Sequence, residues 1–96
     1  MTTPLLNCFG DFMYYVYLLR SKSERQGYYL GYSSDLKRRL QEHNEGKNLS
    51  TRYSQWELVY YEAYQTEKAA RLREKRLKAH GRSYQLLIRR VQSEPE

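Results

Sequence analysis

The sequence predicts an α+β domain in which a small three-stranded antiparallel sheet is flanked by helices, in the order β-β-α-β-α-α. Three short runs, at residues 13–20, 27–33 and 56–64, are rich in Tyr, Val and Leu, as strands are. The segments between and after them show helical periodicity, with capping residues at their starts. Because 96 residues leave room for only one small core, we expect residues 13–91 to form a single domain.

The two ends of the chain are expected to lie outside this domain. Residues 1–12 are mixed in composition, and Pro4 and Gly10 interrupt any periodicity. This segment is predicted to be a flexible leader, with a short apolar flap on the domain as the alternative. Residues 92–96 are polar and contain a proline, which predicts a disordered tail.

Composition indicates a basic protein that binds an anionic partner. Lys and Arg number 17 against 11 Asp and Glu, for a net charge of +6, and nucleic acid is the commonest partner of such a domain. Eleven tyrosines supply strand residues, hydroxyl donors and platforms on which bases can stack. The single cysteine, Cys8, excludes an intrachain disulfide and a cysteine-based zinc cluster. With no apolar run of membrane-spanning length, we expect a cytoplasmic protein without membrane association.

The first two strand-like runs are bounded by polar residues and glycine, which predicts an antiparallel hairpin. Alternation along the first strand places Tyr15, Tyr17 and Leu19 on one face and the residues between them on the other. A tyrosine of the second strand, such as Tyr29, can therefore face a tyrosine of the first.

The first helix follows this hairpin directly. Ser33 or Ser34 can cap it, Asp35 suits the positive end of its dipole, and Gly46 is placed to end it.

Two functional candidates fall on the sheet-facing side of that helix. At about 100° per residue, Arg39 and His43 lie on or beside the stripe formed by Leu36 and Leu40. A charge that faces a packed sheet must be paired or must face a ligand. Alternatively, Arg39 extends along the edge of the stripe to solvent, and His43 is a helix-end histidine that is hydrogen-bonded locally.

The polar loop at residues 46–55 contains Lys47, Arg52 and Tyr53. It is a candidate rim for phosphate contacts, because cations on a loop can follow a nucleic-acid backbone. The alternative is an ordinary solvated loop.

The third strand, residues 56–64, carries apolar groups on both faces. Strict alternation places Leu58 and Tyr60 on one face, with Val59 and Tyr61 on the other. Such a strand is expected to be central in the sheet, or to be covered by helices on both sides.

The second helix carries a carboxylate on its apolar side. Thr66 is expected to cap this helix and Gly81 to end it. One face of it carries Ala70, Glu74, Leu77 and Lys78. A carboxylate between apolar neighbours needs either a metal ion or a basic partner, for which the candidates are Arg39, Arg73 and Lys78.

The last helix repeats apolar residues at helical spacing, namely Tyr84, Leu87, Ile88 and Val91. This stripe is expected to pack on the domain. A helix-turn-helix reader formed by residues 66–91 is therefore disfavoured, since the last helix uses its regular face for packing.

Taken in order, these motifs resemble those of the GIY-YIG endonuclease family, in particular its small single-domain members. The first motif corresponds to Tyr15-Val16-Tyr17 and the second to Tyr29-Leu30-Gly31. Arg39 follows Tyr29 by ten residues, His43 comes four residues later, and Glu74 lies on the second helix. The resemblance covers residues 14–88.

The resemblance implies a metal-dependent endonuclease that hydrolyses phosphodiester bonds in DNA. Glu74 would hold one Mg²⁺ or Mn²⁺ ion, and Arg39 would bind the scissile phosphate. Tyr29 is favoured over Tyr17 for orienting or deprotonating the attacking water, and His43 would support the tyrosine or the phosphate. Tyr32 departs from the family pattern, since some relatives have a lysine there that activates the tyrosine.

The nucleic-acid contacts are assigned to Lys47, Arg52, Tyr53 and Lys78. A chain of this size has little surface with which to specify a long DNA sequence. We therefore expect it to recognise branched, flapped or single-stranded DNA in repair or processing. A partner protein is a further expected source of targeting. The competing hypothesis is a nucleic-acid-binding module without catalysis, in which tyrosines stack on bases and Glu74 only pairs with a cation.

Overall fold

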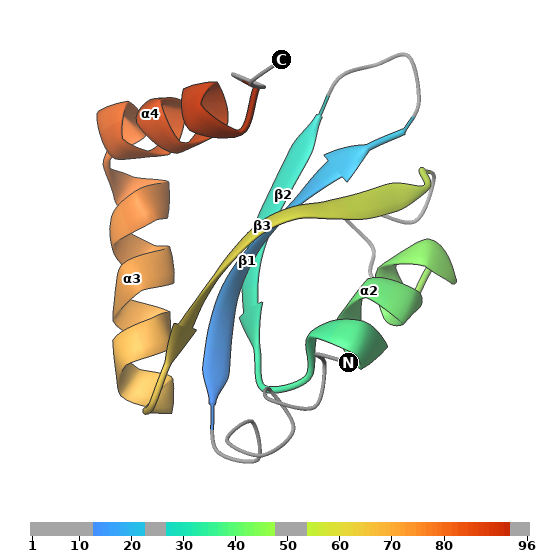
Figure 1. Cartoon of the computed structure of the whole chain (residues 1–96), viewed down its shortest axis with the longest axis horizontal. Coiled ribbons are helices and arrows are strands. Elements are labelled where there is room, and N and C mark those ends of the chain that lie inside the picture. The colour runs from blue at the N-terminus through green and yellow to red at the C-terminus, as the bar shows by residue number, and fades with distance from the viewer. Residues whose placement is uncertain (1–12, 23–26, 48–53, 93–96) are drawn as a thin grey trace, which may run out of the picture.

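The computed structural model describes residues 13–22, 27–47 and 54–92, and its element order confirms the predicted β-β-α-β-α-α domain. One antiparallel sheet has the strand order β2-β1-β3 (Figure 1). The strands are β1 (Tyr14–Ser21), β2 (Tyr28–Ser33) and β3 (Trp56–Tyr64), and the helices are α2 (Leu36–Asn44), α3 (Glu67–Ala79) and α4 (Gly81–Gln92). The predicted leader and the last four residues of the predicted tail lie outside the described residues.

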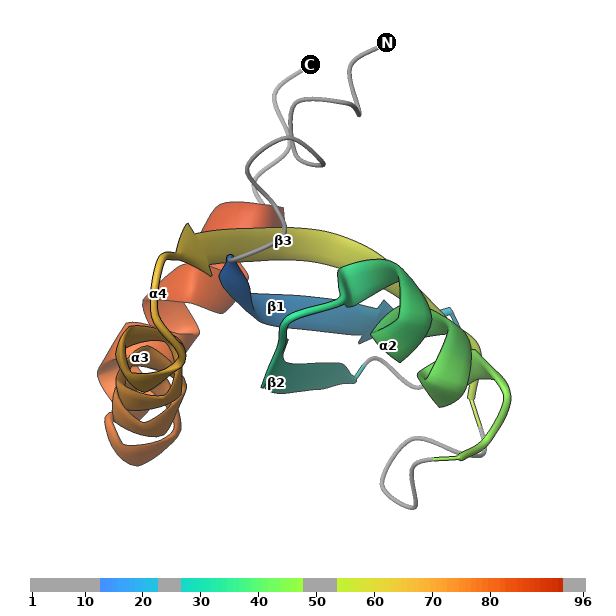
Figure 2. The same ribbon diagram turned by 90° about the horizontal axis from the view of Figure 1, so that it is seen from below.

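The central strand β1 separates two cores, one on each face of the sheet. Helices α3 and α4 cover one face and α2 covers the other, as Figures 1 and 2 show from two directions. Val16 and Leu18 are fully buried beneath α3 and α4, whereas Tyr17 and Leu19 are buried on the face that α2 covers. The alternation expected for β1 is therefore confirmed. The two faces differ in chemistry, because the core under α3 and α4 is the larger and more apolar one.

Strand β3 agrees with one of the two expected positions and corrects the expected alternation. It lies at an edge of the sheet and not at its centre, although α2 and α3 both contact it, in agreement with the second alternative. Leu18 pairs with Tyr60 and Leu19 with Leu58, so Val59 is an extra residue in a register shift. Because of this shift, Leu58 and Tyr60 face opposite sides of the sheet, and strict alternation is wrong there.

The start of α2 is capped by Asp35, not by Ser33 or Ser34. The Asp35 side chain accepts a hydrogen bond from the Arg38 amide at 3.0 Å. Ser33 Oγ instead accepts a hydrogen bond from the Asp35 amide at 2.9 Å, which fixes the turn before the helix. Gly46 has a φ of 78° after the last turn, so the predicted end of the helix is confirmed.

Helix α3 begins as predicted, since Thr66 Oγ1 accepts a hydrogen bond from the Ala69 amide at 3.1 Å. The helix ends at His80, in an extended conformation, and Gly81 is already the first residue of α4. The apolar stripe of α4 packs on the same core as α3, with Leu87 buried. Gln92 belongs to α4 and donates a hydrogen bond to the Tyr28 hydroxyl at 3.2 Å. Among the described residues, no helix combines the length and apolar character needed to cross a membrane.

Candidate active site

Tyr17 lies across the edge strand β2 because its neighbour there is a glycine. Tyr17 pairs with Gly31 in the sheet and is 1% exposed. A Cβ atom at Gly31 would lie 2.6 Å from the Tyr17 hydroxyl oxygen, closer than Cβ contacts occur, and 3.1 Å from the Tyr29 ring, tighter than most of them. Only glycine therefore leaves room for the Tyr17 ring at this point.

Tyr17, Tyr29 and His43 form one cluster on the α2 face of the sheet. The Tyr17 hydroxyl and His43 Nε2 are 2.9 Å apart and share a hydrogen bond, and His43 is fully buried. The ring centroids of Tyr29 and His43 lie 4.6 Å apart, and those of Tyr17 and Tyr29 lie 6.3 Å apart. The hairpin and α2 thus bring together three of the predicted site residues, which come from separate elements.

Burial keeps Tyr17 and His43 uncharged near neutral pH. Burial, reinforced by Tyr29, raises the pKa of Tyr17 to about 12. Burial, reinforced by the positive charge of Arg39, lowers the pKa of His43 below its ordinary value of 6.5. The phenol therefore keeps its proton, and the imidazole is neutral.

Arg39 reaches the same cluster from α2. Its positive charge favours the ionised form of the Tyr17 phenol and so opposes the rise in the pKa of Tyr17. Arg39 also pairs with Glu42 at 3.0 Å, and its side chain is 34% exposed. It lines a hollow of about 350 Å³ whose other walls include Tyr32 and Ser33. Arg39 is therefore partly paired and partly available to a ligand.

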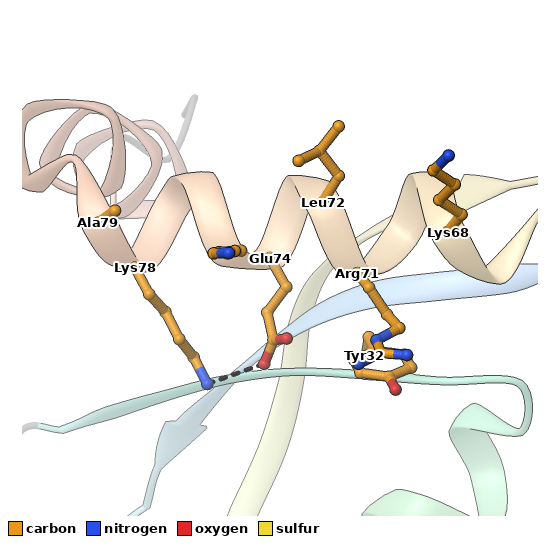
Figure 3. Close-up of a pocket in the computed structure, with 8 residues that line it drawn as sticks. Tyr32, Lys68, Arg71, Leu72, Glu74, Lys78 and Ala79 are labelled. Carbon is orange, nitrogen blue, oxygen red and sulfur yellow. Dashed lines mark ion pairs between the residues drawn. The ribbon is translucent and has the colours of Figure 1, made fainter.

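Glu74 lies on α3 and borders a groove beside β2. Its side chain is 17% exposed and accepts an ion pair from Lys78 at 2.8 Å, which was one of the three basic partners considered. It lines a groove of about 710 Å³ between α3 and β2, where Figure 3 shows Glu74, Lys78 and Arg71 directed toward β2. The negative charge of Glu74 also contributes to the raised pKa of Tyr17. Glu74 and Arg39 therefore have opposite effects on the pKa of the phenol that His43 contacts.

Three neighbouring hollows join these residues along β2. Lys78 borders both the Glu74 groove and a hollow of about 270 Å³ lined by Tyr29. Tyr32 borders both the Glu74 groove and the hollow beside Arg39. Glu74, Tyr29 and Arg39 thus open onto adjoining parts of one surface, although no single hollow contains all three.

The residues present fit a single hard cation held largely by oxygen atoms of a substrate. Within residues 13–22, 27–47 and 54–92, no group of three or more His, Cys, Asp or Glu side chains could hold a metal ion. Glu74 is a carboxylate that already binds a positive charge, the Lys78 ammonium. Mg²⁺ in phosphate-processing sites commonly uses one or two carboxylates together with water and substrate phosphates.

The predicted nucleic-acid contacts are only partly placed. Lys47 is exposed and pairs with Glu45 at 3.3 Å, and Lys78 borders the Glu74 groove. Arg52 and Tyr53 lie outside the described residues. Three further cations line the groove and were not predicted from the sequence, namely Lys68, Arg71 and Lys75. Their helical spacing with Lys78, at i, i+3, i+7 and i+10, was the signal that could have found them.

A second carboxylate, Glu62 on β3, lies on the other side of α3 and was not predicted to have a structural role. It accepts hydrogen bonds from the Tyr60 and Tyr64 hydroxyls, both at 2.6 Å, and from Arg73 at 2.9 and 3.0 Å. Burial alone would raise the pKa of Glu62, but its hydrogen bonds to Arg73 and the two tyrosines hold it below the ordinary value of 4.5. Arg73 is therefore the partner of Glu62 and not of Glu74.

The fold and the polar cluster together define a domain of nuclease type. Residues 13–86 match the family model of the GIY-YIG catalytic domain. This chain therefore belongs to the GIY-YIG family, whose members are generally endonucleases that act on nucleic acid with a divalent metal. It is also similar to a UPF0213 protein of Haloquadratum walsbyi, with 35% identity over 71 residues that cover 72% of this chain and 78% of that protein. No solved structure matches this chain significantly.

Proposed function

We propose that this chain is an endonuclease that hydrolyses phosphodiester bonds in DNA with the help of one Mg²⁺ or Mn²⁺ ion. The observation that carries the proposal is the convergence on the Tyr17 phenol. His43 is hydrogen-bonded to it, while the charge of Arg39 on α2 lowers its pKa and the charge of Glu74 on α3 raises it. Phosphodiester hydrolysis needs a positioned water, an acceptor for its proton and positive charge near the phosphorus oxygens. Arg39 would supply the positive charge, Glu74 with its ion would position the water, and Tyr29, beside Tyr17, would receive the proton.

Arg39 is assigned to the scissile phosphate. Its guanidinium is permanently charged and presents a fork of donors that matches phosphate oxygens. The partial exposure of the side chain leaves donors available to the hollow that Arg39 lines, while its pairing with Glu42 fixes the direction of the guanidinium. Arg39 would stabilise the charge that develops on the phosphate.

The two tyrosines are assigned different roles. A phenol with a pKa of about 12 holds its proton at neutral pH, so Tyr17 orients the phosphate or the water and does not act as the base. Tyr29 is half-buried and lines an open hollow, so its hydroxyl is the better placed to orient or deprotonate water. His43 holds the Tyr17 hydroxyl in place through the hydrogen bond at 2.9 Å.

Glu74 is assigned to the metal ion. When bound, the ion would neutralise charge on the phosphate oxygens and lower the pKa of a coordinated water. The protein supplies the carboxylate, which pairs with Lys78 and is directed toward β2.

The substrate is proposed to be DNA that is recognised by its shape, such as a branched, flapped or single-stranded form met in repair or processing. Ninety-six residues offer little surface for reading a long sequence, so a partner protein is a further source of targeting. The same proposal places the protein in the cytoplasm.

The test is cleavage of labelled duplex, single-stranded, flap and junction DNA with Mg²⁺ or Mn²⁺. We expect the wild type to cut at least one form, and Glu74→Ala and Arg39→Ala to lose cutting while they still bind. Glu57→Ala is the matched control, because Glu57 is also in an ion pair, with Arg20 at 2.6 Å, but contacts none of the site residues. Equal cutting by Glu74→Ala and Glu57→Ala would rule out the assigned role of Glu74.

The alternative is a nucleic-acid-binding module without catalysis, and the Glu74–Lys78 ion pair is the observation that favours it. In that case Glu74 needs no metal, because Lys78 already compensates its charge. A wild type that binds each DNA form but cuts none of them, with either metal, would support the module and reject the enzyme.

A further inference from the structure

Four cationic side chains form a row along one side of α3. Lys68, Arg71, Lys75 and Lys78 fall within an arc of about 80° when successive residues are placed about 100° apart. All four are exposed and line the groove between α3 and β2. The helix therefore holds them as a fixed array, which we call the α3 cation row.

Most of the charge in this row is not compensated. Lys78 pairs with Glu74, but Lys68, Arg71 and Lys75 form no ion pair within the part of the chain that the structure describes. The Arg71 guanidinium lies 6.0 Å from the centre of the Tyr32 ring, so a tyrosine of β2 orients it (Figure 3). Three like charges held beside one another repel, and they attract a polyanion to the groove.

We propose that the α3 cation row binds the sugar-phosphate backbone of the nucleic-acid strand that is cut. This inference rests on the proposed function, because it places the strand along the groove that contains Glu74. A regular series of phosphates suits the row better than an acidic peptide does, because contacts to phosphates need charge at intervals and no side-chain pockets.

The geometry of the helix predicts the extent of these contacts. Lys68 and Lys78 are ten residues apart, or about 15 Å along the helix axis at ~1.5 Å per residue. That length corresponds to about four phosphates of one strand when the row runs parallel to the duplex axis, along which each strand has one phosphate per ~3.4 Å. Lys68 lies about 9 Å before Glu74 along the axis and Lys78 about 6 Å after it. Contacts therefore extend to both sides of the phosphate at Glu74, and further toward the start of α3.

The test is the salt dependence of binding to labelled duplex and single-stranded oligonucleotides in EDTA, where no metal-dependent cutting occurs. The row variant is Lys68→Ala with Arg71→Ala and Lys75→Ala, which leaves Lys78 and Glu74 intact. Each lost phosphate contact reduces the slope of log K against log salt by about 0.9 for duplex and about 0.7 for a single strand. We therefore expect a loss of about 2 to 3 in slope for the row variant.

The matched control removes the same charge elsewhere, with Lys37→Ala, Arg76→Ala and Arg89→Ala. These three residues are exposed and do not line the groove, and Arg76 lies on α3 itself. The control variant should keep most of the wild-type slope. Equal slopes for the row and control variants would overturn the inference. Circular dichroism melting of both variants checks that each remains folded.

This experiment tests the α3 cation row independently of the proposed cutting activity, because it measures binding under conditions in which no cutting occurs. Suppose that the wild type never cuts, but the row and control variants differ in salt slope as expected. That result would support backbone binding by the α3 cation row and would contradict the proposed endonuclease activity. If the wild type does cut, the row variant should raise KM several-fold and leave kcat close to that of the wild type, since the row does not touch the reacting atoms. Parallel DNA and RNA oligonucleotides identify which backbone the row prefers.

Discussion

Glu62 and Glu74 are two carboxylates beside the same helix that are equally exposed and differently surrounded. Their side chains are 15% and 17% exposed, respectively. Glu62 accepts four hydrogen bonds, two from tyrosine hydroxyls and two from Nε and Nη2 of Arg73. Among the described residues, Glu74 forms an ion pair with Lys78 alone and borders an open groove.

The difference separates a structural carboxylate from a functional one. The partners of Glu62 take up its oxygen lone pairs and leave little capacity for a ligand. Glu74 keeps acceptor capacity beside a groove, and its single partner can swing away without disturbing the core. The exposed fractions of the two side chains do not distinguish Glu62 from Glu74. The number and rigidity of their partners do.

Among the changes that test the difference between Glu62 and Glu74, the largest expected effect is a loss of DNA cleavage. Glu74→Gln removes a charge and keeps the shape of the side chain, so cleavage should fall about 100-fold or more, equivalent to ~2.7 kcal/mol of transition-state stabilisation. Thermal unfolding should change by less than about 0.5 kcal/mol, as for other partly exposed ion pairs. Single-turnover cleavage and calorimetry measure the two quantities. A Glu74→Gln protein that cuts normally would erase the distinction.

The second prediction concerns stability. Glu62→Gln leaves Arg73 without its charged partner, so the free energy of unfolding should fall by about 2 kcal/mol. Urea unfolding measures this change. The control is Glu57→Gln, whose ion pair with Arg20 is more exposed and should contribute less than about 1 kcal/mol. If both variants lost the same stability, the network around Glu62 would add nothing to an ordinary surface pair.

The third prediction is a pH dependence that belongs to Glu62. Its pKa in the folded protein is held below the ordinary value of 4.5, so between these two values the unfolded chain binds more protons. Stability from Glu62 is therefore complete above about pH 4.5 and is lost as the pH falls below it, by at most about 1.4 kcal/mol per pH unit. Glu62→Gln should lack this component in unfolding curves measured from pH 6 to pH 3. A variant with the wild-type pH dependence would show that other groups cause it.

The smallest expected effect is on the metal requirement. Lys78→Met removes the cation that competes for Glu74, and an i,i+4 pair of this kind contributes about 0.3–0.5 kcal/mol. The metal concentration for half-maximal cleavage should therefore fall about twofold at saturating DNA. Lys75→Met removes a neighbouring cation that does not pair with Glu74 and should leave this concentration nearly unchanged. An increased requirement in Lys78→Met would mean that the lysine helps to hold the ion.

Local periodicity was sufficient to predict much of the fold and part of the site. Arg39 and His43 lie beside the Tyr17 cluster because the rotation per residue in a helix is fixed, so their direction follows from Leu36 and Leu40. The element order and the apolar stripe of α4 follow from the same kind of signal.

The errors arose where distant residues decide the outcome. The register shift at Val59 depends on how β3 pairs with β1, which alternation within one strand does not reveal. Asp35 caps α2 because Ser33 is already bonded within the turn, and several neighbouring residues could have served. Alternation along a strand places Glu62 on the same face as Tyr60 and Tyr64. It does not reveal that this face lies close to α3, where Arg73 pairs with Glu62.

The hydrogen bond between Tyr17 and His43 has a consequence for how the rate of cutting should vary with acidity. The phenol loses its proton only near pH 12, and the imidazole gains one only below pH 6.5. Neither partner changes its charge between these limits, so the bond survives across the whole physiological range. If the cleavage rate rises as the pH passes through 7, the titrating group must then be the attacking water or a residue other than Tyr17 and His43. A pH–rate profile of the site can therefore be interpreted with the charges of these two residues held constant.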